Sequence, residues 1–152
     1  MKPLLVLAWG NRSRGDDALG PRLLDALQMA LTRAQHERVE LLEAHQLQPE
    51  HALDLLGRQR VLLADADPAA TPPFEVREVQ PRRDATLASH ALSPAALLAV
   101  AQPLCPGQAL PPVTLLALHA QTFELGVEPG VAAQSALRAT VPWALRWIDD
   151  DA

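Results

Sequence analysis

The short apolar run Leu4–Trp9 constrains the fold of this chain more than any other feature. It consists of six apolar residues and is followed at once by the pair Gly10-Asn11 and then by two carboxylates, Asp16 and Asp17. A continuous aliphatic run of this length is typical of a buried strand in a parallel sheet that helices cover on both faces. In such sheets ligands bind beyond the carboxyl ends of the strands. The sequence therefore predicts an α/β fold with a functional edge directly after its first strand.

Similar aliphatic runs recur along the chain, and segments with helical periodicity separate them. Parallel strands need long crossover connections, which are usually helices. We therefore expect a three-layer α/β sandwich, in which a central, mostly parallel sheet of about five strands has helices on both faces. The expected central strands are Leu4–Trp9, Val39–Ala44, Val61–Ala66 and Val113–Leu118, and the more polar Phe74–Val79 is expected at an edge.

Four segments carry helix signals, three of them opened by a proline close to the first turn. The first predicted helix contains Pro21 and an apolar stripe of Leu23, Leu24, Leu27 and Leu31. The second starts at Pro49 and carries Ala52, Leu55 and Leu56, and the third follows the cap Ser93-Pro94 over 95–101. The last spans about Ala133–Ile148, and Pro142 inside it predicts a kink or a late start.

Length and composition limit the possible partners and the cellular location. The 152 residues fit a single domain, 1–152, and the hydrophobic fraction of 49% is that of a globular protein. The net charge of −5, with no basic run longer than Arg82-Arg83, argues against nucleic acid and anionic membranes as partners. The single cysteine, Cys105, excludes an internal disulfide and fits a reducing compartment. No apolar segment approaches the roughly 20 residues that cross a bilayer. We therefore expect a cytoplasmic protein.

Three polar segments are expected to meet at the carboxyl edge of the sheet. Residues 11–17 follow the first strand, Asp65 and Asp67 end the third, and His90 stands just before the Ser93-Pro94 helix start. Two carboxylates and an imidazole that converge suit a transition metal with open coordination positions, because imidazole favours zinc or nickel over magnesium or calcium. The sequence thus predicts a metal-dependent site, although it contains no local ligand motif.

Each candidate residue also has a purely structural interpretation. Asp16 and Asp17 are favourable at a helix start, Asp65 could belong to a turn with Asp67, and His90 could bond near the following helix cap. The side-chain amide of Asn11 is most simply a turn partner for nearby backbone, and its functional interpretation is that it braces the loop of Asp17. The glycines match no phosphate-binding loop, and no serine or cysteine stands in a nucleophile motif.

Three motifs together resemble the endopeptidases that mature nickel-iron hydrogenases. The segment 5–20, with its Gly10-Asn11 turn and acidic helix start, is similar to the first strand and loop of that family. Residues 62–66 resemble its central strand ending in Asp-Ala, and residues 89–93 resemble its Ser-His helix entry. The chain departs from the family at Ala8, where many members have glycine, at Asp17, where some have glutamate, and at Asp67, in a usually apolar neighbourhood.

The resemblance implies an activity and a set of ligands. The second acidic residue of the first motif, the strand-end aspartate and the histidine correspond here to Asp17, Asp65 and His90, as both metal ligands and catalytic residues. The expected activity is removal of the C-terminal extension from a hydrogenase large-subunit precursor. The expected metal is the nickel already installed in that precursor, with no permanent metal or organic cofactor in the protease.

The resemblance also leaves alternatives open. Residues 46–52 resemble the branch that serves bidirectional, NAD-linked hydrogenases. A hydrolase with a resident metal and another substrate could use the same carboxylates, and a non-catalytic chaperone could bind a hydrogenase subunit without shortening it.

Overall fold

The computed structural model describes residues 1–83 and 92–150. Its core is a five-stranded sheet with the strand order β2-β1-β3-β5-β4. Neighbouring strands are parallel except for β4 and β5, which are antiparallel. The strands are β1 (Leu4–Trp9), β2 (Val39–Ala44), β3 (Arg60–Asp67), β4 (Phe74–Glu78) and β5 (Val113–His119).

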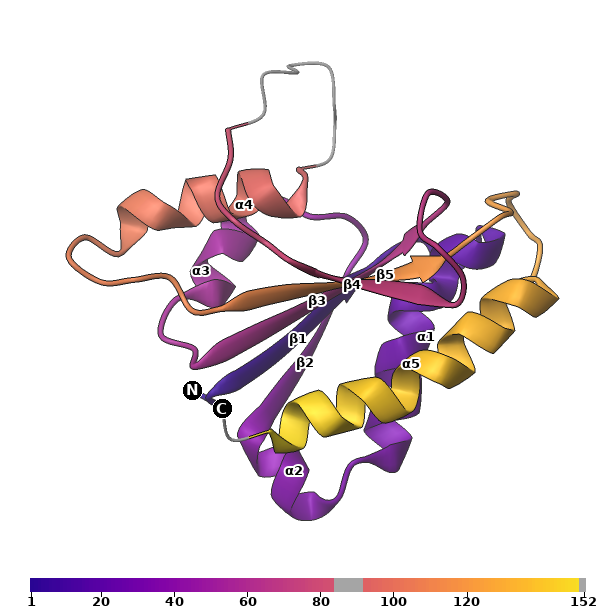
Figure 1. The fold of residues 1–152 in the computed structure, drawn as a ribbon, viewed down its shortest axis with the longest axis horizontal. Helices are drawn as coiled ribbons and strands as arrows, with labels where there is room; N and C mark the ends of the chain where they lie inside the picture. Colours follow the sequence, from indigo (N-terminus) through magenta and orange to yellow (C-terminus); the bar gives the residue numbers. More distant parts are fainter. Residues whose placement is uncertain (84–91, 151–152) are drawn as a thin grey trace.

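Helices cover both faces of this sheet, so the predicted three-layer α/β class is confirmed (Figure 1). Side chains alternate along each strand, so Val6 and Leu62 pack under α1 and α5, whereas Leu7 and Leu63 pack under α3 and α4. The described helices are α1 (Leu19–Ala30), α2 (Arg33–Arg38), α3 (Ala52–Leu55), α4 (Pro94–Ala101) and α5 (Val131–Asp149), with 3₁₀ helices at Gly15–Ala18, Pro49–His51 and Gln102–Leu104. None of these described helices is long and apolar enough to cross a membrane.

The five predicted strands are present, with small differences at their ends, but one expected position is wrong. β2, expected to be central, lies at an edge beside β1, in keeping with its partly exposed glutamates. The first two coincide with β1 and β2, whereas β3 extends the third prediction by one residue at each end and β5 ends one residue later. The edge strand β4 ends at Glu78 instead of Val79, although the backbone N–H of Val79 still donates to the carbonyl of Val113.

The helix predictions need more correction. Leu31 lies outside α1 because its backbone is extended and the following Thr32 caps a separate helix, α2. This six-residue helix has no apolar stripe and was not predicted. Leu56 likewise ends α3 in extended conformation. The last helix begins at Val131, earlier than predicted, and continues through Pro142.

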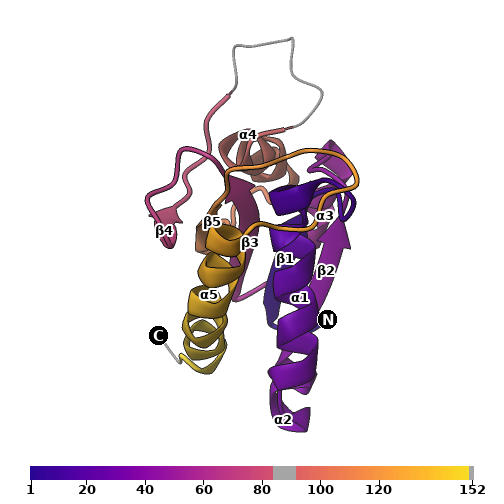
Figure 2. The same ribbon diagram turned by 90° about the vertical axis from the view of Figure 1, so that its right-hand side faces the viewer.

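The connectivity identifies one special position along the sheet. From β1 the chain crosses to β2 on one side, and then returns to β3 on the other side of β1. The carboxyl ends of β1 and β3 therefore form the topological switch point, where open α/β sheets bind their ligands. In the side view, β4 lies at the opposite outer edge from β2 (Figure 2).

Candidate functional site

The loop after β1 holds Asp17 against the end of that strand. Gly10 has φ 145°, and a Cβ built on it would lie 1.9 Å from the carbonyl oxygen of Asp17. The backbone N–H of Asn11 donates to Asp17 Oδ2 at 2.7 Å. The side chain of Asn11 instead accepts from the N–H of Ser13 at 2.8 Å. Both interpretations of Asn11 are thus combined, since its backbone braces Asp17 and its side chain closes the turn.

Its neighbour Asp16 has a different environment. The Asp16 side chain is buried, with 1% of the residue exposed. It accepts the backbone N–H groups of Gln121, Thr122 and Gly130 at 2.7, 3.1 and 2.8 Å. Burial alone would raise the pKa of Asp16, but these three donors outweigh it and hold the pKa below its ordinary value. Asp16 therefore anchors the loop after β5, whereas Asp17 is only half-buried.

Asp65 is the most strongly perturbed carboxyl group at this edge. Burial raises its pKa to about 7, and the negative charge of Asp17 contributes in the same direction. The N–H of Ala66 and the indole N–H of Trp9 donate to the Asp65 carboxylate and offset part of this effect. A carboxyl group with a pKa near neutrality can both accept and donate a proton under physiological conditions.

Strand alternation places Asp65 on the sheet face that α3 and α4 cover, the face of Leu63. The chain enters α4 over this same face. Leu92 packs against the apolar cluster of this layer, and Ser93 caps α4 by accepting the N–H of Ala96 at 3.1 Å. The predicted cap is therefore confirmed. His90, the third predicted ligand, lies outside the described residues.

Asp67, two residues beyond Asp65, has the predicted turn role. Its side chain accepts the N–H of Ala69 at 2.8 Å and pairs with Arg77 at 3.0 Å. Over residues 1–83 and 92–150, no group of three or more His, Cys, Asp or Glu side chains is arranged to hold a metal ion. Of the three predicted ligands, the described structure thus brings two together, Asp17 and Asp65.

Two features of the site were not predicted from the sequence. One is Trp9, which we assigned only to a strand but whose indole reaches Asp65. The other is Arg12, which bonds both Asp25 and Glu43 at 2.8 Å or less on the outer side of the loop. Beside Arg12, a hollow of about 350 Å³ lies between the ends of β1 and β2. The register of β1 on β3 would have identified Trp9 as the neighbour of Asp65.

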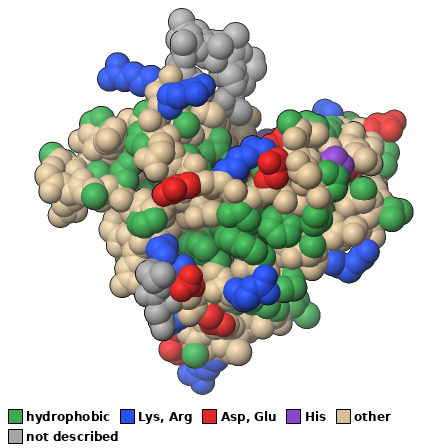
Figure 3. Space-filling model, in the orientation of Figure 1, with side chains coloured by type: hydrophobic (Ala, Val, Ile, Leu, Met, Phe, Trp, Pro, Cys, Tyr) green, Lys and Arg blue, Asp and Glu red, His purple; other side chains and the backbone are tan. Residues whose placement is uncertain are grey.

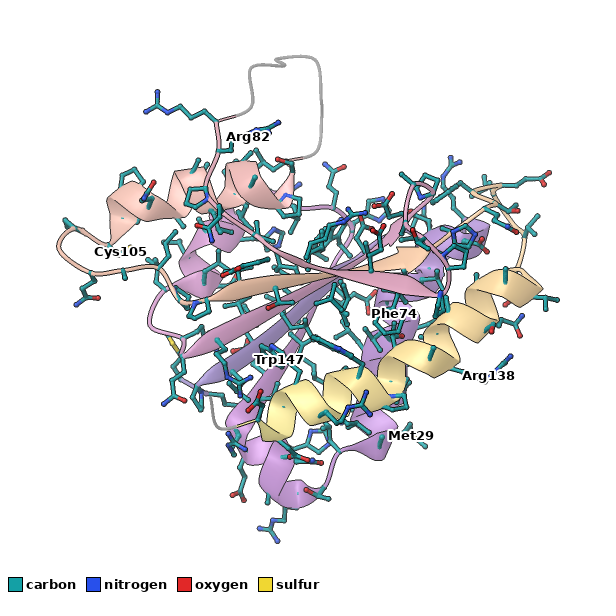
Figure 4. All side chains as sticks on the ribbon, in the orientation of Figure 1. Met29, Phe74, Arg82, Cys105, Arg138 and Trp147 are labelled. Carbon is teal, nitrogen blue, oxygen red and sulfur yellow. The ribbon has the colours of Figure 1, made fainter. Side chains whose placement is uncertain are left out.

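Cys105 and the other described histidines have separate roles. Cys105 follows α4 at the amino-terminal end of the sheet, away from the carboxyl edge, and its thiol donates to backbone carbonyl groups (Figure 4). His119 bonds the carbonyl of Ala70 through Nδ1 at 2.9 Å, and His51 accepts the N–H of Gln48 at 2.9 Å. These contacts support structural roles for the two histidines.

Comparison of the sequence with protein-family models and with curated proteins gives no match. The structure, in contrast, is similar to solved hydrogenase maturation proteases. HycI from Thermococcus kodakarensis superimposes with a TM-score of 0.73 at 16% identity, covering 98% of this chain and 94% of that one. HybD from Escherichia coli superimposes with a TM-score of 0.73 at 21% identity, covering 98% of this chain and 93% of that one. A hydrogenase 2 maturation peptidase from a Thaumarchaeota archaeon superimposes with a TM-score of 0.66 at 24% identity, covering 97% of this chain and 98% of that one. At these identities the likeness establishes a shared fold over nearly the whole chain.

Proposed function

We propose that this chain is an endopeptidase that removes the C-terminal extension of a [NiFe] hydrogenase large-subunit precursor after nickel insertion. The observation that carries the proposal is the pairing of Asp17 and Asp65 at the switch point between β1 and β3. The likeness of the fold to hydrogenase maturation endopeptidases supports the same assignment. The substrate class comes from the sequence motifs that resemble that family.

In this proposal Asp17, Asp65 and His90 complete the coordination shell of the precursor's nickel. The backbone N–H of Asn11 bonds Oδ2 of Asp17, which would leave Oδ1 available to bind the metal. Burial and, after it, the charge of Asp17 raise the pKa of Asp65, and a cation between the two carboxylates would oppose both effects, so its binding would release a proton at neutral pH. His90 is included because residues 89–93 resemble the Ser-His helix entry of that family.

The same carboxylates serve the hydrolysis of the adjacent peptide bond. A bound divalent metal polarises a carbonyl and lowers the pKa of a coordinated water. Asp17 is fixed by the Gly10-Asn11 turn and would orient that water. Asp65, which loses its proton when the cation binds, would accept the proton of the water and return it to the leaving amine. The indole N–H of Trp9 keeps the Asp65 carboxylate in place during this transfer.

The test is the intact mass of a candidate large subunit before and after incubation with this chain. We expect nickel-loaded precursor to lose its extension and nickel-free precursor to remain whole. Asp17→Asn keeps the acceptor for Asn11 but removes the charge, and it should abolish cleavage, as should His90→Ala. The matched control is His36→Ala, which changes a half-buried histidine in α2 and should be fully active. Equal cleavage of both precursors, or an active Asp17→Asn variant, would overturn the proposal.

Three finer points belong to the same proposal. The protease has no resident metal, so stoichiometric zinc or manganese in the untreated protein would favour a hydrolase of another substrate. The cognate enzyme is a bidirectional, NAD-linked hydrogenase. This assignment rests on the resemblance of residues 46–52 to that branch, and it is tested by comparing cleavage of precursors from bidirectional and from other [NiFe] hydrogenases. The reaction takes place in the cytoplasm, in keeping with a chain that has one cysteine.

A further inference from the structure

The outer edge of β4 has free backbone hydrogen-bonding groups. β4 has a single neighbour, β5, and their antiparallel register pairs Val76 with Leu116. The N–H of Val79 donates to Val113, and in an antiparallel pair the residues that bond the neighbour alternate. The backbone of Val76 therefore points away from the sheet, as do those of Phe74 and Glu78. In the described part of the chain, none of these outward groups has a hydrogen-bond partner.

An apolar strip lies beside this edge, on the face that α5 covers. We define the β4–α5 strip as Phe74, Val76, Trp143 and Trp147. Val76 is 45% exposed, and the three aromatic residues are partly buried against the core below them. Hydrophobic side chains gather on this face between β4 and α5 (Figure 3), and Phe74 and Trp147 lie toward the two ends of the strip (Figure 4).

On the α5 face this edge carries little charge: Glu78 ends β4, and Arg60 stacks on Trp147 at 4.6 Å from the ring centroid. Natural edge strands are protected by their shortness, by prolines and by charges that point outward. β4 is short and follows Pro73. Its charges Glu75 and Arg77 point to the opposite face, where they pair at 2.8 Å, and of the charges in β4 only the terminal Glu78 shares the face of Val76. The central outward residue, Val76, is apolar and thus leaves the edge open to another strand.

The edge is continuous with the site of Asp65. The register pairs Asp65 with Ala117, and Phe74 with the adjacent Leu118, so β4 begins at the sheet edge where β3 ends. A strand added beyond β4 would lie three strand spacings from β3, about 14 Å. An extended chain covers this distance in four or five residues at about 3.4 Å each.

We propose that the free edge of β4 and the β4–α5 strip bind the C-terminal extension of the precursor as a sixth strand of the sheet. The proposal rests on the proposed function, which places the scissile bond at Asp65. The extension leaves the cleavage site toward its own C-terminus, away from the carboxyl edge, and β4 runs the same way. The added strand is therefore parallel to β4. It begins four or five residues after the scissile bond and turns apolar side chains at alternate positions toward the strip.

A second copy of this chain would be a weaker occupant of the same edge. Five residues of strand pairing are a small contact for two folded domains that associate from free solution. An extension tethered through the nickel site is already held close to the edge, and its high effective concentration makes a short pairing sufficient. The structure therefore favours the extension over self-association.

Val76→Pro is the decisive variant. It removes the outward N–H of residue 76 but no hydrogen bond to β5, so the sheet retains its ladder. Its control, Val76→Ala, shortens the side chain but keeps the N–H. We expect Val76→Pro to raise the KM for full-length precursor about tenfold with little change in kcat, and Val76→Ala to raise it less. With a precursor whose extension is cut to four residues, wild type and both variants should have the same KM.

A second measurement does not depend on the variant's folding or on cleavage. A synthetic extension peptide at about millimolar concentration, which replaces the effective concentration that the tether supplies, should slow hydrogen exchange of the Val76 and Glu78 amides. The Asp54 amide in α3 should not respond. Three outcomes would each overturn the inference. They are an unchanged KM for Val76→Pro, a raised KM of this variant that persists with the four-residue extension, and a change in the sedimentation of the variant without a change in KM. If wild type shortens no precursor at all, the proposed function fails instead.

Discussion

Asp17 and Asp65 are coupled across the switch point of the sheet: after burial, the charge of Asp17 is the largest cause that raises the pKa of Asp65 to about 7. The two carboxylates come from a tight loop and from a central strand, and each is held by hydrogen bonds of its own. Their coupling is therefore a property of the folded scaffold. It can be measured without any substrate.

The first prediction concerns this coupling. Asp17→Asn should lower the pKa of Asp65, because it removes a negative charge while keeping an acceptor for Asn11. Asp67→Asn should lower it by a smaller amount, since Asp67 ranks after Asp17 among the charges that raise it. The measurement is a carbon-detected NMR titration of the Asp65 carboxyl group. A pKa that does not move in the Asp17 variant would contradict the coupling.

The second prediction concerns stability against pH. A carboxyl group whose pKa is raised by folding binds more protons in the folded state, so the free energy of unfolding falls as pH rises from about 4 to about 7 and then levels off. Asp65→Asn removes this loss and should stabilise the protein at pH 8 by up to about 4 kcal/mol. At pH 4 the variant and wild type should be nearly equal. Urea unfolding at several pH values is the measurement, and a stabilisation that is equal at both pH values would contradict it.

The third prediction separates the two adjacent aspartates. Asp16→Ala leaves three backbone N–H groups without their acceptor and should destabilise the fold by about 2–4 kcal/mol. Asp17→Ala removes one such bond and should cost about 1 kcal/mol. Because the pKa of Asp16 is lowered by folding, its contribution is present above about pH 4 and is lost as pH falls further. Denaturation curves of both variants at pH 7 and pH 3 measure this, and a smaller loss for Asp16→Ala than for Asp17→Ala would refute it.

The fourth prediction concerns the turn that fixes Asp17. Gly10→Ala would place a methyl group 1.9 Å from the carbonyl oxygen of Asp17, so the loop must move. We expect a loss of stability of about 2–4 kcal/mol and loss of cleavage. The control is Gly107→Ala, which also has a positive φ but has no atom within 4 Å of the new methyl group, and it should cost about 1 kcal/mol. Thermal unfolding and the precursor assay give the two readouts, and similar losses in both variants would show that the Asp17 contact is unimportant.

Much of the sheet follows directly from the sequence, because buried parallel strands are continuous aliphatic runs. The run at 4–9 has the bounds of β1, since Gly10 ends it sharply. The prediction at 39–44 has the bounds of β2, although this strand contains two glutamates and lies at an edge. α2 was missed because its six residues carry charge and no apolar stripe, so its start depends on the capping box of Thr32 and Gln35.

The site was predictable in part. Strand ends that share one edge bring Asp17 and Asp65 together, and this much follows from a parallel sheet. Composition could not say which of Asp16 and Asp17 is buried, because the partners of Asp16 lie in a loop more than a hundred residues away. The indole contact of Trp9 depends on a register that the sequence alone does not define.

The three long-range bonds of Asp16 have a consequence for biosynthesis. In the part of the chain that the structure describes, its carboxylate oxygens accept from residues 121, 122 and 130, so the amino-terminal loop stays incomplete until 130 of the 152 residues have been synthesised. A nascent or prematurely terminated polypeptide therefore carries an uncompensated charge beside Asp17. The loop that carries Asp17 is therefore completed late in synthesis, once the loop that follows β5 is present to bond Asp16.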